Sequence, residues 1–156
     1  MTSGVSFVDT SILCNILPIP GRDQDRKAVV EELWSKRHAG EALILPVAAV
    51  IEAGNFIAHL ADGHSRRIVA QKFSGMLELV IKNEAPWKLH QFTWGDSFLK
   101  ELIDGGGTGV TLIDHAVREM GAGDLCILAE RKIYAERTGL SSVKIWTKDY
   151  SLASYC

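Results

Sequence analysis

The chain has 156 residues, 47% of them hydrophobic and 23% charged, a composition typical of an ordinary globular protein, and we expect a single domain over residues 1–156. The formal net charge of -2 argues against a protein that holds nucleic acid mainly by a large positive field, although it leaves room for a local basic patch. No apolar run approaches the roughly 18–20 residues needed to cross a bilayer, and three cysteines without CxxC spacing indicate neither a disulfide framework nor a thiolate zinc site, so we expect a cytoplasmic protein outside the membrane.

The first part of the chain predicts strands that alternate with helices. Residues 5–8 form a short apolar, partly β-branched run that ends at Asp9, which suits a buried parallel strand. Residues 22–39 carry apolar side chains at helical spacing. Residues 42–45 form a second apolar run, and the helix predicted after it contains Glu52.

The remaining segments continue this alternation. They are, in chain order, a helix over 64–83, a strand over 87–92, helices over 98–103 and 110–120, a helix from Asp124 to about 137, a strand over 143–146 and a short helical tail over 147–156. Parallel neighbouring strands require crossover connections, which the helices would supply. The predicted fold class is therefore α/β, with three layers (α/β/α) and a central, mainly parallel sheet.

Four carboxylates stand at positions that suit a shared site. Asp9 and Asp149 come at or just after strand ends, where open parallel sheets bind ligands. Asp124 lies at a helix start, where the helix dipole favours an ionised carboxylate, and Glu52 lies in an apolar helical segment, where an unpaired charge would be costly. Four carboxylates without paired His or Cys describe a site for Mg²⁺ or Mn²⁺, and such ions suit phosphodiester hydrolysis.

In these four places the chain resembles the PIN-domain ribonucleases, which include VapC-type toxins of toxin–antitoxin pairs. The matching segments are FVDTSIL around Asp9, LPVAAVIEAGNF around Glu52, GAGDLCILAER around Asp124 and WTKDYSL around Asp149. The resemblance implies that these acids bind the metal, that RNA is the substrate and that Thr10, Ser11 and Thr147 are orienting hydroxyls. Residues 87–109, including DGGGTG, lie outside the family's pattern.

Each acid also has a simpler interpretation. The sole role of the three aspartates, Asp9, Asp124 and Asp149, could be to cap helices or form turns. Glu52 could instead form a salt bridge with an Arg or Lys of another helix. Asn55 lies one turn from Glu52, so it is a candidate substrate contact, although a surface amide is equally consistent.

Other polar features are left outside the predicted site. Asp114 and His115 are assigned to a solvated helix face, and residues 105–109 lack the Lys and Ser/Thr of a P-loop, so we interpret them as a flexible hinge. The four tryptophans are assigned to no role in RNA binding. Candidate phosphate contacts are Arg22, Arg26, Lys27, Arg66, Arg67 and Lys148, although charged residues on helices are usually only solvated.

The leading hypothesis is a metal-dependent endoribonuclease that is the toxin of a toxin–antitoxin pair, with an antitoxin protein as partner and a homodimer as its assembly, the latter two by resemblance only. The alternative is a non-catalytic PIN-like module that binds RNA or protein. A phosphatase of the haloacid dehalogenase type is disfavoured, because that chemistry needs a second Asp two residues after the nucleophile, where Ser11 stands.

Overall fold

A computed structural model describes residues 4–156 and shows an α/β fold around a three-stranded parallel sheet. The strands β1 (Val5–Val8), β2 (Ala42–Ile44) and β3 (Val143–Trp146) are arranged in the order β2-β1-β3. Every residue of β1 is buried, as expected for the central strand of a covered parallel sheet. The predicted α/β class and the predicted parallel sheet are confirmed.

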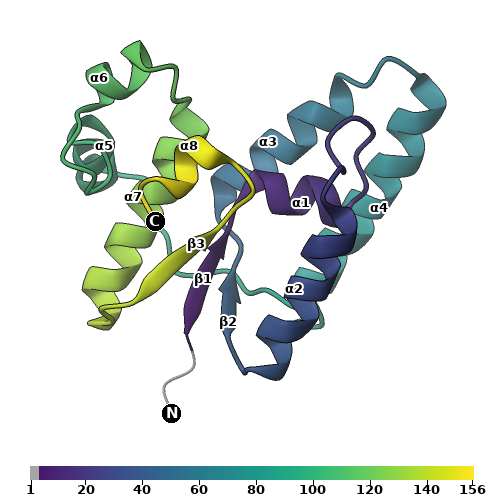
Figure 1. Ribbon diagram of the computed structural model, residues 1–156, viewed down its shortest axis with the longest axis horizontal. Helices are drawn as coiled ribbons and strands as arrows, with labels where there is room; N and C mark the ends of the chain where they lie inside the picture. Colours follow the sequence, from purple (N-terminus) through teal and green to yellow (C-terminus); the bar gives the residue numbers. More distant parts are fainter. Residues whose placement is uncertain (1–3) are drawn as a thin grey trace.

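Helices cover the sheet and connect its strands. In Figure 1, α1 to α4 lie to one side of the strands and α5 to α7 to the other. None of the helices within residues 4–156 combines the length and apolarity that a membrane span requires. The helices are α1 (Thr10–Ile16), α2 (Arg26–His38), α3 (Val47–Ala58), α4 (Gly63–Ile81), α5 (Asp96–Ile103), α6 (Leu112–Val117), α7 (Ala122–Thr138) and α8 (Tyr150–Ala153).

Small side chains let α3 lie close to its neighbours. Ala48, Ala49 and Ala53 are buried on this helix, which contacts both α1 and α7. Because alanine adds only one carbon beyond the backbone, the three helices can approach closely at the carboxyl ends of the strands. This packing places Glu52 of α3 near the start of α7.

The segment predicted as a strand over residues 87–92 is not one. Only Lys88 pairs with the sheet, through a bridge to Ile44 and hydrogen bonds to Leu43 and Leu45. Beyond it, His90 turns inward and contacts Glu130 of α7 through Nε2 and Oε1, 2.9 Å apart. The alternating pattern therefore reflects side chains packed against helices, and no ladder continues.

Two features near the N-terminus also differ from expectation. Helix α1 was not predicted, because its seven residues are too few to show a clear helical period. The helix expected from residue 22 begins at Arg26, because Pro20 and Gly21 form a turn in which the Arg22 N–H donates to the Ile19 carbonyl at 2.9 Å.

The glycine run at residues 105–109 is anchored, which contradicts the predicted flexible hinge. Gly105 and Gly106 are buried and have φ angles of 90° and 63°, which disfavour other residues. A Cβ on Gly106 would lie 2.9 Å from the Cβ of Leu128 on α7. The run is glycine-rich because it turns in the left-handed region and approaches a helix closely.

The prediction of a solvated face holds for Asp114 and is wrong for His115. His115 is 1% exposed, its Nε2 lies 2.8 Å from the Thr108 hydroxyl, and its ring meets Tyr155 edge-on with centroids 5.2 Å apart. His115 thus joins the glycine run to the C-terminal segment and has a structural role.

Candidate active site

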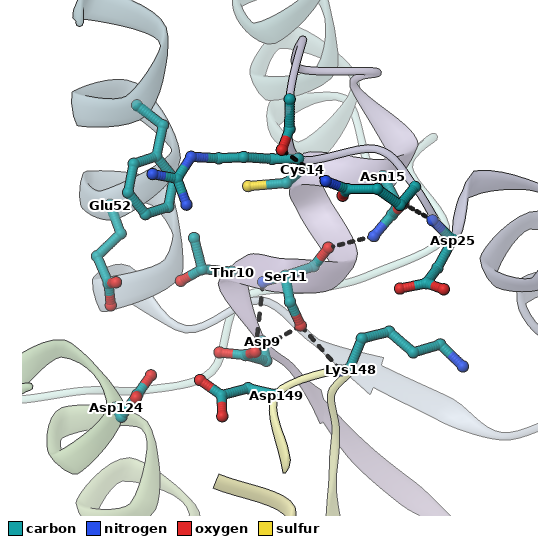
Figure 2. A pocket seen from close by; sticks show the side chains of 14 residues that line it. Asp9, Thr10, Ser11, Cys14, Asn15, Asp25, Glu52, Asp124, Lys148 and Asp149 are labelled. Atoms are coloured by element: carbon teal, nitrogen blue, oxygen red, sulfur yellow. Dashed lines mark hydrogen bonds between the residues drawn. The ribbon is translucent and has the colours of Figure 1, made fainter. Parts of the chain in front are cut away.

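The four predicted acids line one pocket at the carboxyl end of the sheet. Asp9 follows β1 and Asp149 follows β3, and these strands are paired neighbours, so their ends meet at one edge. Glu52 comes from α3, and Asp124 from the first turn of α7. Figure 2 shows the four side chains around the same space, and all of them line the pocket.

Asp9 divides its two oxygens between the fold and the pocket. Its Oδ2 accepts hydrogen bonds from the hydroxyls of Ser11 and Thr147, both at 2.7 Å, and from the Ser11 N–H at 3.3 Å. The residue is 2% exposed, and Oδ1 has no hydrogen-bond partner within residues 4–156. The hydroxyls therefore fix the carboxylate and leave one buried oxygen without a hydrogen bond.

Asp149 is a helix cap as well as a pocket residue. Its Oδ1 accepts from the N–H groups of Ser151 and Leu152 at 2.8 and 3.3 Å, which caps α8. Its own N–H donates to the Thr147 hydroxyl at 2.9 Å. Thr147 thereby connects Asp149 to Asp9, and the second carboxylate oxygen of Asp149 takes no part in the cap.

Glu52 brings a partly buried carboxylate without a basic partner. The ion pairs among residues 4–156 do not include it, so the salt bridge considered above is not formed. Its Oε1 is buried without a well-formed hydrogen bond. Burial, followed by the charge of Asp9, raises the pKa of this carboxyl, and the nearby Thr10 hydroxyl partly opposes the shift. A Cβ on Gly123 would lie 1.8 Å from that oxygen, so residue 123 must be glycine for Glu52 to hold this position.

The other three acids affect the pKa of Asp124. Burial, then the charges of Asp9, Glu52 and Asp149, raises the pKa of Asp124 from 3.8 to about 7. Its side chain does not cap α7, whose N-cap is Gly121, so the simple capping interpretation is not supported. At neutral pH this carboxyl is poised between its two protonation states.

The remaining predicted residues are placed unequally. Thr10 lines the pocket, and its hydroxyl is buried without a hydrogen-bond partner in the described chain. Asn55 is exposed and does not line the pocket, because Phe56 occupies that side of α3. The structure therefore gives no support to Asn55 as a substrate contact.

Two basic residues reach the pocket. Arg22 and Lys148 line it, and Lys148 forms an ion pair with Glu32. Arg26 instead donates to backbone carbonyls at the end of α1, and Arg66 donates to carbonyls of the connection between α3 and α4. The sequence suggested all six basic residues as phosphate contacts. It could not show which two line the pocket together with the acids.

The donors of the pocket match a hard divalent cation in chemical type, although their present spacing encloses no ion. They are carboxylates and hydroxyls, and two buried carboxylate oxygens lack donors, a costly arrangement unless positive charge balances it. No group of three or more His, Cys, Asp or Glu side chains within residues 4–156 is close enough to enclose a metal ion. The acids thus face one pocket without forming a closed ligand shell.

Comparison with known proteins gives no family assignment. No protein-family model matches the chain, and no curated protein matches it in sequence. Function is therefore inferred from the residues of the pocket and from the resemblance of the four segments that carry them.

Proposed function

We propose that this protein is a divalent-metal-dependent endoribonuclease of the PIN-domain type, which hydrolyses RNA phosphodiester bonds. One observation carries the proposal: four carboxylates from four different elements line one pocket, and two of their buried oxygens lack any donor. Asp9, Glu52, Asp124 and Asp149 would hold Mg²⁺ or Mn²⁺ through oxygen ligands. When bound, such an ion supplies Lewis-acid chemistry to the phosphodiester and lowers the pKa of nearby water.

The protein's own groups prepare this chemistry. The hydroxyls of Ser11 and Thr147 hold Asp9 in one orientation, and the cap of α8 holds Asp149. Asp124, with its pKa of about 7, can give up its proton when positive charge enters the pocket. No side chain here needs to form a covalent bond with the substrate, because water can be the nucleophile.

The finer parts of the proposal come from the resemblance. RNA as substrate, the role of a toxin, control by an antitoxin protein and assembly as a homodimer all belong to the family that the four segments resemble. A cytoplasmic location is proposed on another ground, the three scattered cysteines without CxxC spacing. The exposed side of the pocket, which Arg22 lines, suits a polyanionic chain.

The test is cleavage of total RNA with Mn²⁺ and with a chelator. Asp124→Asn keeps the size of the side chain and removes its charge, so we expect a loss of roughly 100-fold or more in cleavage rate with the fold retained. Asp96→Asn is the matched control, because Asp96 is exposed and also lies in the first turn of a helix. Unchanged cleavage by Asp124→Asn would defeat the proposed site.

The second candidate is a PIN-like module that binds RNA or protein without cutting. The open arrangement of the acids, which encloses no ligand group of three within the described residues, favours it. Binding of RNA that is equally strong in chelator and in Mn²⁺, with no cleavage in either, would establish this alternative and exclude the nuclease.

A further inference from the structure

An arginine in the wall of the pocket is stacked on an aromatic ring. The guanidinium carbon of Arg22 lies 3.6 Å from the centroid of Phe56, and both residues line the pocket. Phe56 is four positions after Glu52 on α3, which places the two side chains on one side of the helix, one turn apart. The cationic group is therefore held about one helical turn from an acid of the site.

The backbone that carries this arginine is also fixed. Ile19 is fully buried, and its carbonyl accepts the Arg22 N–H at 2.9 Å. Between them, Pro20 fixes its own φ and Gly21 has a φ of 82°, as a type II turn requires. Both ends of Arg22 are thus held, its backbone by the turn and its guanidinium by Phe56.

The charge of Arg22 is not used elsewhere in the described chain. The ion pairs among residues 4–156 do not include Arg22, whereas Lys148, the other basic residue of the pocket, is paired with Glu32. Stacking uses the face of the guanidinium and leaves its in-plane N–H donors free. These donors match the geometry of a phosphate, which accepts two parallel hydrogen bonds from arginine.

We propose that Arg22 binds a backbone phosphate of the RNA beside the carboxylate site, with Phe56 holding the guanidinium in position. This inference depends on the proposed function, and it assigns a substrate-binding residue that the four acids do not supply. A polyanion that approaches four carboxylates meets repulsion, and a fixed cation in the same wall offsets it. The contact is to phosphate, so it does not read the base sequence.

The test measures binding separately from cleavage. A fluorescent single-stranded RNA is titrated with protein in Mg²⁺ at several salt concentrations, with Asp124→Asn as the background so that the RNA stays intact. In this background, Arg22→Gln is expected to weaken binding about 5- to 20-fold and to reduce the slope of log affinity against log salt by about 0.7, the value for one lost contact to a single strand.

Two further variants separate charge from geometry. Arg22→Lys keeps the charge, so we expect the salt slope to be retained while affinity falls several-fold with the loss of the planar donors. Arg118→Gln, at an exposed arginine that follows α6 outside the pocket, makes the same charge change as Arg22→Gln and should leave affinity and slope unchanged. With cleavage-competent protein, Arg22→Gln should raise KM more than it lowers kcat.

The outcomes are distinct for the two proposals. If Arg22→Gln binds RNA as Arg118→Gln does, the role of Arg22 is refuted while the nuclease can stand. If the protein never cleaves RNA but Arg22→Gln still weakens binding, the catalytic proposal fails and the phosphate contact stands. If the protein binds no RNA at all, both are refuted.

Discussion

At the scale of single residues, helix capping and a role in the site are compatible in one carboxylate. Asp9 and Asp149 each use one oxygen to cap a following helix and keep the other outside that cap. A sequence can show that an acid follows a strand, but both roles give the same pattern. Only the structure shows that the second oxygen of Asp9 is buried without a hydrogen-bond partner in the described chain.

The raised pKa of Asp124 predicts an unusual pH dependence of stability. Between about pH 4 and about pH 7 the folded protein binds more protons than the unfolded chain, so its free energy of unfolding falls as pH rises through this window. Asp124→Asn removes the titrating group. Without added metal, the variant should be roughly 1–3 kcal/mol more stable than the original protein at pH 8. This range is a fraction of the free energy that corresponds to the whole pKa shift of Asp124.

Urea unfolding at pH 4 and pH 8 in chelator measures this difference. The difference should shrink toward pH 4, because Asp124 is protonated in the folded protein there and partly protonated in the unfolded chain, where its pKa is near the ordinary 3.8. A variant that is less stable than the original at pH 8 would show that the carboxylates do not repel one another in the folded protein. Asp96→Asn again provides the control for a carboxylate lost from a first helical turn.

Thr147 is predicted to orient the site through its hydroxyl. Thr147→Val keeps the shape of the side chain and removes the 2.7 Å hydrogen bond to Asp9 and the 2.9 Å acceptor for the Asp149 N–H. We expect roughly 10- to 100-fold weaker Mn²⁺ binding, as for other residues that orient metal ligands. Calorimetric titration measures it, with Thr138→Val, whose exposed hydroxyl bonds only helix carbonyls, as control; equal affinity in both variants would contradict this role.

At the scale of secondary-structure elements, the close contact between α3 and the start of α7 has a clear test. In Gly123→Ala, the added methyl group meets the Glu52 carboxylate, which must move out of its present position. Because that carboxylate ends a flexible side chain, stability should change by less than about 1 kcal/mol, while metal affinity and any cleavage fall.

The control for this element is Gly75→Ala on α4. A Cβ there meets nothing within 4 Å, so the substitution should stabilise the protein by roughly 0.5–1 kcal/mol through helix propensity and leave the site unchanged. Thermal unfolding and metal titration of both variants give the comparison. Normal metal affinity in Gly123→Ala would show that Glu52 is not needed for metal binding.

Prediction from sequence succeeded for long or strongly apolar elements. It failed where tertiary contacts determine the conformation or burial of a segment. β3 was predicted at its observed bounds, because apolar β-branched residues follow a glycine stop. The alternation at residues 87–92 could not reveal that His90 pairs with Glu130 of a later helix. Likewise, the residue pattern around His115 did not indicate that its side chain is buried and hydrogen-bonded to the Thr108 hydroxyl.

At the scale of the whole molecule, the fold joins acids that lie far apart in the chain. Their convergence could be predicted, since parallel strands present their carboxyl ends at one edge. The contact of Arg22 with Phe56 could not, because its geometry depends on how the loop before α2 packs against α3. Patterns along the chain therefore identify candidate ligands better than the residues that would hold a substrate.

Divalent metal should stabilise the whole fold, and more strongly at higher pH. The Asp124 carboxyl, with a pKa of about 7, must lose its proton to bind a cation, so affinity should rise between pH 6 and pH 8. A ligand that binds only the folded state raises the midpoint of thermal unfolding. We expect a larger rise with about 5 mM Mg²⁺ at pH 8 than at pH 6, and no such pH dependence in Asp124→Asn.

Because β1 pairs with β3, the pocket can form only after both strands have been synthesised. Asp9 is made well before Thr147, whose hydroxyl orients it, because 138 positions of chain separate the two residues. A ribosome that has not yet reached residues 147–149 therefore carries a nascent chain whose pocket is incomplete. For an enzyme that cuts RNA, this order of synthesis would delay any damage to the message being translated until residues 147–149 have been added.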